Sequence, residues 1–199
     1  MKVHREKDHT ERELAIYRQL DGSVPNIPIL QDQGENYIIL TDNGRQICTS
    51  DPSFLFVDVL DALEVAHQKG LVHRDVRPAN ITIRDGKAAL VDWGFATHKD
   101  KVANFSGTMS FASDHVLADP QKYRPNDDLH SLVRSLVYLK ELHASKLCRS
   151  PELEKLRAFW QGLKVPFFYK QLANLAEALD YKSLRDQLKA HPLAGVHVS

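Results

Sequence analysis

The chain has 199 residues and a formal net charge of zero, with 26 basic and 26 acidic side chains. This balance gives no reason to expect a nucleic-acid surface or a membrane surface, and no apolar run is long enough to span a bilayer. The length suits one domain with a sizeable core. Cys48 and Cys148 are far apart and no signal-peptide core follows Met1, so we expect reduced thiols and an intracellular protein of the cytoplasm or nucleus.

The first quarter of the chain predicts one helix and two strands. Residues 11–20 have apolar side chains at helical spacing, and Asp21-Gly22 closes the pattern. Residues 27–30 and 37–40 are apolar runs that predict strands around a polar turn at residues 32–35. A connector of turn residues follows at 41–44.

The middle of the chain carries two polar motifs around a predicted hairpin. An apolar helix is expected over residues 53–69, ended by Gly70, and the motif HRDVRPAN follows at residues 73–80. A short β-branched run, an Asp-Gly turn at Asp85 and a second apolar run predict a hairpin over residues 81–91. The motif DWG begins directly after it at Asp92, so the hairpin should bring Asn80 and Asp92 to one point.

These residue types suit phosphoryl transfer, which needs a positioned hydroxyl and positive charge around a phosphate. Asp75 could accept or orient the proton of the hydroxyl. Asn80 offers an uncharged oxygen and Asp92 a charged one, a pair that suits Mg²⁺ because this ion takes few protein ligands and keeps several waters. The alternative is that all three are ordinary turn residues.

The last third predicts a helical bundle. Residues 128–142 carry a strongly apolar face that should form the buried centre of this part. Further helices are expected over residues 153–160, 167–179 and 184–190, with Pro151 and Pro166 near their starts or breaks.

Six motifs together resemble one known family. HRDVRPAN and DWG look like the catalytic loop and the metal-binding DFG motif of eukaryotic protein kinases. The segments GTMSFAS, DDLHSL, WQGLK and DYKSLR, which begin at residues 107, 127, 160 and 180, are similar to segments of the casein kinase one group in the same order. The resemblance runs from about residue 53 to residue 190.

The resemblance implies an α+β, protein kinase-like fold and a cofactor pair of ATP and Mg²⁺. Residues 1–43 would form an abbreviated N-terminal lobe, with one helix and a few strands, and residues 44–199 a mainly helical C-terminal lobe of the same kinase-like domain. The implied activity is transfer of the γ-phosphate to serine or threonine hydroxyls of a protein substrate. A regulatory protein partner is a further possibility.

The resemblance also assigns catalytic and metal-binding roles residue by residue. Asp75, Arg77 and Asn80 would be catalytic, with Asp75 as the base and Arg77 on the transferred phosphate. Asn80 and Asp92 would hold Mg²⁺. Arg77 stands where these kinases usually have lysine. Its planar guanidinium group keeps the positive charge, but its length and geometry differ from those of lysine. Trp93 replaces the usual phenylalanine, and its ring should fill the same apolar slot if the indole N–H finds a partner.

Nucleotide contacts are expected from Lys2, Glu13, Leu40 and Asp42, together with Asn80 and Asp92. Lys2 could grip the phosphates and pair with Glu13, but it could also lie in a frayed terminus, and Glu13 could lie on a solvated helix face.

Three further residues have expected supporting roles. Arg74 could pair with a phosphate on the segment from Asp92 to Ser113, which would order that segment. Thr108 should support Asp75 by hydrogen bonding. Asp128 should accept backbone N–H groups of the catalytic loop and hold it in a strained shape.

One expected feature is absent from the sequence, since no G-x-G-x-x-G stands upstream of residue 44. Either the domain is naturally minimal or the sequence starts late in a longer domain. Without this loop a catalytically weak or inactive kinase-like module that binds other proteins is the main alternative to an active kinase. A small-molecule phosphotransferase similar to aminoglycoside kinases is a third possibility, and the GTMSFAS segment argues against it because those enzymes lack it.

Overall fold

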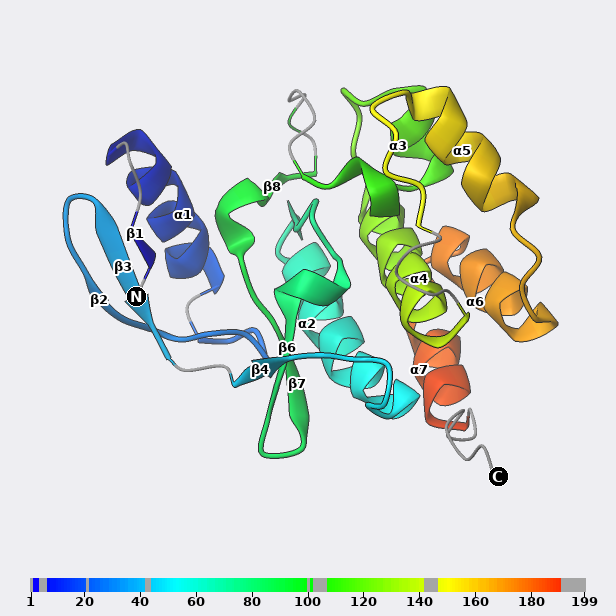
Figure 1. The fold of residues 1–199 in the computed structure, drawn as a ribbon. Coiled ribbons are helices and arrows are strands. Elements are labelled where there is room, and N and C mark those ends of the chain that lie inside the picture. Colours follow the sequence, from blue (N-terminus) through cyan, green and yellow to red (C-terminus); the bar gives the residue numbers. More distant parts are fainter. Residues whose placement is uncertain are drawn as a thin grey trace.

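The computed structural model describes residues 2–3, 7–20, 22–41, 44–99, 101, 107–141 and 147–190. The fold is mixed α and β, with few short strands and many helices (Figure 1). The strands are β1 Lys2–Val3, β2 Leu30–Gln33, β3 Tyr37–Leu40, β4 Arg45–Gln46, β5 Leu71–Val72, β6 Ile81–Arg84, β7 Lys87–Leu90 and β8 Thr97–His98. The α-helices are α1 Lys7–Leu20, α2 Phe56–Gln68, α3 Asp114–Ala118, α4 Pro125–Glu141, α5 Leu153–Gly162, α6 Phe167–Glu177 and α7 Tyr181–Ala190. Single 3₁₀ turns are η1 Ser53–Leu55, η2 Pro78–Asn80, η3 Trp93–Phe95 and η4 Met109–Phe111.

The N-terminal part consists of α1 beside a small antiparallel sheet in the order β1-β3-β2 (Figure 1). In the central strand Ile38 lies opposite Lys2 of β1 and is fully buried. Helix α1 contributes Leu14, Ile16 and Leu20 to the same core. The apolar spacing along residues 11–20 therefore correctly indicated the buried helix face, although α1 begins earlier, at Lys7.

The strand predicted at residues 27–30 is displaced in the structure. Strand β2 begins at Leu30 and runs to Gln33, across the predicted turn. Pro28 has no N–H to donate to a strand partner. Ile29 instead donates its N–H to the Thr41 hydroxyl at 3.0 Å, and its carbonyl accepts the Thr41 N–H at 2.9 Å. The apolar run thus serves as the entry to the sheet.

The predicted hairpin is present as β6 and β7, joined by Asp85 and Gly86. Both turn residues are left-handed, with φ of 50° and 75°, as a two-residue hairpin turn requires. Strand β4 adds to the outer edge of β6, in a segment for which the sequence analysis predicted no strand. Gly44 precedes β4, and a Cβ there would lie 2.2 Å from the Ile83 carbonyl oxygen, so the chain passes the hairpin too closely for a side chain.

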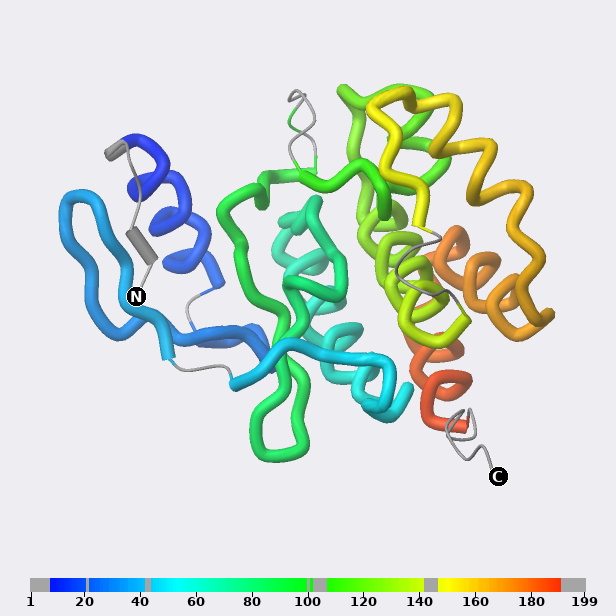
Figure 2. The backbone as a smooth tube through the Cα atoms, in the orientation of Figure 1, coloured from blue at the N-terminus to red at the C-terminus, as the bar shows by residue number. Residues whose placement is uncertain are grey.

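The C-terminal part is a bundle around α4, on the opposite side of the hairpin from α1 (Figures 1 and 2). Helix α4 packs on α2 and α6, and α7 packs on α2 and α6. The four predicted helices are all present with shifted ends. Helix α6 stops at Glu177 because Leu179 turns left-handed (φ 54°), and Asp180 then accepts the Ser183 N–H to begin α7. Among the described residues no helix combines the length and apolarity needed to cross a membrane.

Candidate active site

Asp128 of α4 holds the start of the loop that carries the HRDVRPAN motif. Its carboxylate accepts the backbone N–H of His73 at 2.7 Å and that of Arg74 at 2.8 Å. Arg74 has a left-handed backbone (φ 73°), which is costly for a side chain of its size. These contacts confirm the prediction that Asp128 accepts backbone donors from a strained loop.

Asp75 is nearly fully buried and its carboxylate receives three donors. The amide nitrogen of Asn80 donates to Oδ2 at 2.8 Å, and Arg77 Nε lies 3.2 Å from the same oxygen. The backbone N–H of Thr108 donates to Oδ1 at 2.8 Å. Thr108 therefore supports Asp75 as predicted, with its N–H as the donor. The arrangement fixes the position of one carboxylate at the meeting point of two loops.

The hairpin brings Asn80 and Asp92 together, as its sequence predicted. Ile81 pairs with Leu90 at the end of the ladder, and the next N–H, that of Val91, donates to the Asn80 carbonyl at 2.9 Å. Asp92 follows directly, half-buried, with a left-handed backbone (φ 63°, ψ 67°). Two oxygen-bearing side chains thus stand at the open end of one two-stranded ladder.

Trp93 fills the core behind this point. It is fully buried, and its indole N–H donates to the Leu90 carbonyl at 3.0 Å, which supplies the partner that the sequence required. The His73 ring packs edge-on against it with centroids 4.7 Å apart, and His73 Nε2 lies 3.1 Å from the Val91 carbonyl oxygen. Burial lowers the pKa of His73, although the charges of Asp128 and Asp75 oppose this shift.

Helix α1 packs against the turn that begins at Trp93, which brings Glu13 and Tyr17 to this side. Glu13 is fully buried, so the alternative of a solvated helix face is wrong. Burial raises the pKa of Tyr17, and the charges of Glu13 and Asp92 raise it further. Glu13 and Asp92 therefore act on the same phenol from two segments far apart in sequence.

The remaining nucleotide-site candidates are placed only in part. Lys2 lies in β1, at the edge of the sheet, and its side chain is outside the described part. Leu40 ends β3, half-buried against the main core. Asp42 falls outside the described residues.

Arg74 packs in an environment that the sequence analysis did not address. Its side chain lies over the ring of Tyr123, with the guanidinium carbon 5.8 Å from the centroid, and the residue is only 6% exposed. Burial lowers its pKa, against the opposing effect of Tyr123 and Asp128. Part of the segment between Asp92 and Ser113 is outside the described residues, so pairing with a phosphate there stays a prediction.

Two residues that the sequence analysis missed reinforce Asp128 from behind. His67 Nε2 lies 3.0 Å from Asp128 Oδ2, and His67 Nδ1 lies 2.6 Å from the hydroxyl of Tyr181. The position of His67 on the buried face of an apolar helix could have indicated a buried polar contact. It does not identify the partners, which lie 61 and 114 residues away in the sequence. The chain of contacts thus links α7 through α2 to the loop that holds Asp75.

This fold and this loop define a protein kinase domain. The family model described as "Protein kinase domain" matches residues 29–146, more than half of the chain. The chain therefore belongs to the protein kinase family. A solved structure of vaccinia related kinase 3 superposes with a TM-score of 0.70 over 95% of this chain and 77% of that one, at 16% identity, which supports the fold alone.

Curated relatives include kinases from distant organisms. A probable serine/threonine-protein kinase of Dictyostelium discoideum is 26% identical over 176 residues, which cover 79% of this chain and 28% of that protein. A second one from the same organism is 30% identical over 48% of this chain and 18% of its own length. Sperm motility kinase 2B of Mus musculus is 35% identical over 45% of this chain and 19% of its own length. The chain thus spans less than a third of these relatives.

Proposed function

We propose that this domain is an ATP- and Mg²⁺-dependent protein kinase that phosphorylates serine or threonine hydroxyls, within or near the casein kinase one group. The observation that carries the proposal is the buried Asp75 carboxylate, held by Asn80, Arg77 and the Thr108 N–H at 2.8 to 3.2 Å. A hydroxyl brought to this carboxylate would find an acceptor that is already oriented. Thr108 belongs to the segment that would face a protein substrate. The hydrogen bond from its N–H to Asp75 would therefore connect the substrate-binding segment to the proposed catalytic carboxylate.

The side-chain oxygens of Asn80 and Asp92, at the open end of the hairpin, suit Mg²⁺ as ligands. Both hydrogen bonds that the Asn80 side chain makes to described residues use its nitrogen, to the Asp75 carbonyl and to Asp75 Oδ2, which leaves the amide oxygen available as a ligand. Asp92 adds a charged oxygen beside it. A bound Mg²⁺ would supply charge neutralisation for the phosphates of ATP. Arg77, a third exposed in its side chain, would exchange its contact with Asp75 for the transferred phosphate.

We extend the proposal to the nucleotide and to the lobes. Glu13, buried beside Tyr17, would orient Lys2 on the phosphates, and Leu40 and Asp42 would contact the rest of the nucleotide. The lobe boundary would lie near residue 43, just before Gly44 passes the hairpin.

The location and a partner are part of the same proposal. The free thiols of Cys48 and Cys148 support an intracellular location, because thiols stay reduced there. Ile29, 61% exposed beside β2, is an apolar side chain that a regulatory protein partner could cover.

One sequence feature favours the alternative, a kinase-like module that acts by binding proteins. No G-x-G-x-x-G stands upstream of residue 44. Phosphates that are not covered by such a loop would be open to water.

Transfer of labelled γ-phosphate from ATP to generic protein substrates, with and without Mg²⁺, separates the two functions. We expect transfer that needs Mg²⁺ and is lost in Asp75→Asn and in Asp92→Ala. Asp85→Asn is the matched control, because Asp85 sits at the exposed hairpin tip and its left-handed backbone accepts asparagine readily. Absence of transfer by a folded wild-type chain at ample ATP would reject the enzyme and favour the binding module.

A further inference from the structure

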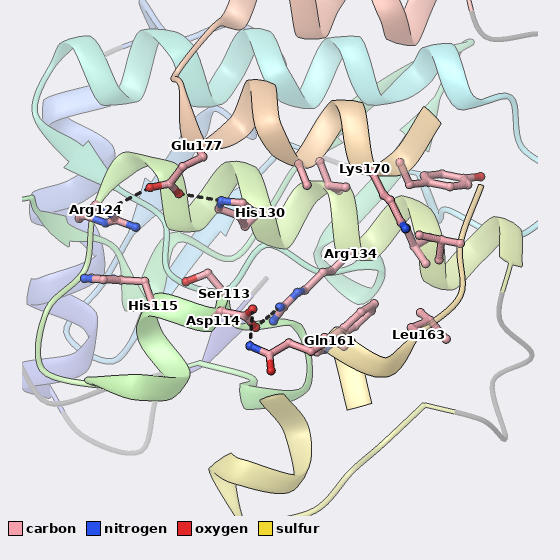
Figure 3. Close-up of a pocket in the computed structure, with 16 residues that line it drawn as sticks. Ser113, Asp114, His115, Arg124, His130, Arg134, Gln161, Leu163, Lys170 and Glu177 are labelled. Carbon is pink, nitrogen blue, oxygen red and sulfur yellow. Dashed lines mark hydrogen bonds and ion pairs between the residues drawn. The ribbon is translucent and has the colours of Figure 1, made fainter. Parts of the chain in front are cut away.

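A cavity of about 440 Å³ lies in the helical part (Figure 3), and Asp75, Asn80 and Asp92 are not among the residues that line it. It is lined from α3, α4, α5, α6 and the α5–α6 linker. Its apolar wall includes Val133 and Val137 of α4, Leu163 and Val165 of the linker and Ala173 of α6. This volume is within the range of about 300 to 1,000 Å³ that is usual for small-molecule sites. The cavity is therefore large enough for a small organic ligand with an apolar body.

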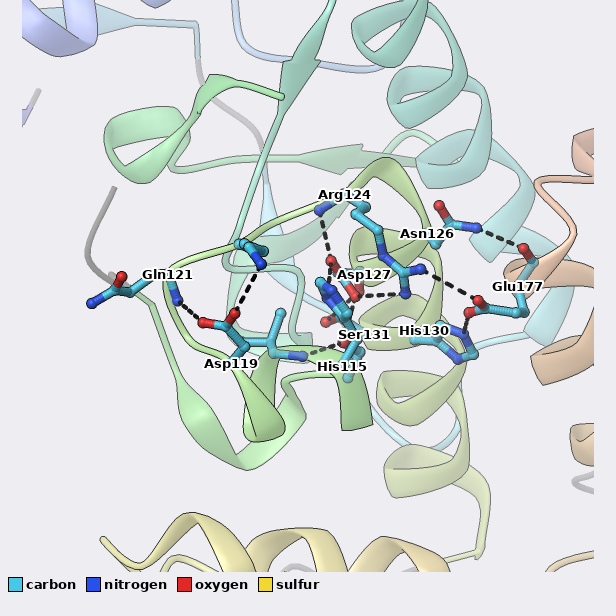
Figure 4. Close-up of polar contacts among 12 residues, drawn as sticks. His115, Asp119, Gln121, Arg124, Asn126, Asp127, His130, Ser131 and Glu177 are labelled. Carbon is cyan, nitrogen blue, oxygen red and sulfur yellow. Dashed lines mark hydrogen bonds and ion pairs between the residues drawn. The ribbon is translucent and has the colours of Figure 1, made fainter. Parts of the chain in front are cut away.

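Basic side chains that line the cavity are mostly bound to carboxylates of the protein. Arg124 and His130 both hold Glu177, at 3.4 and 3.0 Å, as Figure 4 shows. Arg134 holds Asp114 at 2.6 Å (Figure 3). His115 likewise lies 3.2 Å from Asp127. These four groups already have carboxylate partners within the protein.

Lys170 differs from these four. It is exposed on α6, and its side chain extends into the group of residues that line the cavity (Figure 3). Within the described part of the chain no carboxylate pairs with its ammonium group. The cavity therefore combines an apolar wall with one basic group that is available to an acid.

We propose that this cavity binds a small amphipathic carboxylate, such as a medium-chain alkanoate. Its carboxylate pairs with the Lys170 ammonium, and its apolar chain packs against Val133, Val137 and Ala173. A positively charged ligand would gain nothing from Lys170. An uncharged ligand of the same length would keep only the apolar contacts.

The cavity wall is also connected to the segment that would face a protein substrate. The indole N–H of Trp160 donates to the Ser110 carbonyl at 2.9 Å, and Arg134 donates to the Ala112 carbonyl. The Arg134 guanidinium carbon lies 4.8 Å from the centroid of the Trp160 ring. A ligand that packs on this pair contacts the two side chains that hold residues 110 and 112. An effect on phosphate transfer follows only if the proposed kinase activity holds, whereas ligand binding does not depend on it.

Titration of the folded chain with octanoate and with 1-octanol at pH 7.5 tests the site. Binding is followed by tryptophan fluorescence, because Trp160 lines the cavity while Trp93 is fully buried elsewhere. We expect octanoate to bind more tightly than octanol. Lys170→Gln should weaken octanoate about fivefold and leave octanol unchanged, as expected for one partly exposed ion pair. Lys164→Gln, a change of a neighbouring exposed lysine outside the cavity lining, should alter neither.

A second variant tests the cavity itself. Ala173→Phe places a ring in the cavity and should abolish the binding of both ligands, while its unfolding transition shows that the domain is intact. The proposal is overturned if octanoate shows no saturable binding below about 10 mM. It is equally overturned if Lys170→Gln and Lys164→Gln have the same affinity for octanoate, or if octanol binds as tightly as octanoate. None of these outcomes bears on whether the chain transfers phosphate.

Discussion

His73 donates its backbone N–H to a carboxylate oxygen of Asp128 at 2.7 Å, across the interface between the loop that carries the HRDVRPAN motif and the central helix α4. The other oxygen of Asp128 accepts the N–H of Arg74, whose left-handed backbone would otherwise be unfavourable. Asp128 is fully buried, so neither N–H group has water as a substitute. The shape of the loop that presents Asp75 thus depends on one side chain of α4.

Replacement of Asp128 should therefore lower the stability of the domain, and also its activity if the chain is a kinase. Asp128→Ala leaves two buried N–H groups and His67 without their acceptor, and we expect it to lower the free energy of unfolding by about 3–5 kcal/mol. Asp128→Asn keeps one acceptor and should cost less. Urea unfolding followed by circular dichroism measures the difference. Equal stability of the alanine variant and the wild type would show that the loop holds its shape without Asp128.

Tyr181 should act on the same loop at a distance. Tyr181→Phe removes the hydroxyl that bonds His67 at 2.6 Å, and His67 in turn contacts Asp128. We expect a loss of about 1 kcal/mol in the free energy of unfolding and, if the chain is a kinase, a lower kcat with little change in the KM for ATP. Tyr37→Phe is a suitable control, because the Tyr37 hydroxyl bonds no residue in the described part. If both variants behave alike, the contact with His67 does not position the loop.

The local sequence predicted the hairpin and the helices, because turn residues and apolar spacing act over a few positions. The Asp85-Gly86 turn, the buried face of α1 and the ends of the ladder at Asn80 and Asp92 follow from such signals. The motif pattern also predicted that Asp128 would accept backbone N–H groups. The turn and the apolar spacing need no knowledge of distant contacts, whereas the contact of Asp128 with His73 spans 55 residues and was expected only from the family resemblance.

Other features arise from contacts between segments that are distant in sequence. Strand β2 is displaced because Ile29 bonds Thr41 rather than a strand partner, which its apolar side chain does not reveal. The link from Tyr181 to His67 spans 114 residues. Arg74 packs on Tyr123, an environment that the sequence analysis did not predict. Tertiary packing decides such cases, and one sequence holds no direct record of it.

Trp93 should tolerate phenylalanine better than alanine. Trp93→Phe keeps most of the apolar volume but loses the N–H bond to the Leu90 carbonyl, for a cost of about 1–2 kcal/mol in the free energy of unfolding. Trp93→Ala also leaves a cavity beside His73 and should cost about 3–5 kcal/mol. Thermal unfolding of the three chains measures this order. Similar midpoints for the two variants would mean that the neighbouring side chains collapse into the vacated space.

The low pKa of the buried His73 should make the protein less stable in mild acid. The unfolded chain binds a proton at an ordinary histidine pKa of about 6.5, whereas the folded chain resists it because the ring is buried. Below about pH 6.5 the unfolded state therefore holds more protons, and the free energy of unfolding falls by up to about 1.4 kcal/mol per pH unit until the folded pKa is reached. Above pH 6.5 this contribution is constant.

The measurement for His73 is urea unfolding from pH 7.5 to pH 5 in Mg²⁺-free buffer, with an NMR titration of the histidine rings. A His73 resonance that titrates above pH 6.5 in the folded protein would contradict the expectation. His98, which is exposed, provides an internal comparison in the same spectra.

Asn26 ties the N-terminal segment to the hairpin and α2. Its carbonyl accepts the Leu90 N–H at 2.9 Å, its side-chain nitrogen donates to the Asp58 carbonyl at 3.0 Å, and its backbone is left-handed (φ 56°). Asn26→Ala loses the side-chain bond and strains the backbone, for about 2–3 kcal/mol in the free energy of unfolding. Asn26→Gly loses the same hydrogen bond, but glycine adopts the left-handed backbone conformation without strain. We therefore expect it to lower the free energy of unfolding by only about 1–2 kcal/mol. Denaturant unfolding of both variants tests this order, and a glycine variant less stable than the alanine variant would show that the left-handed conformation carries little strain at this position.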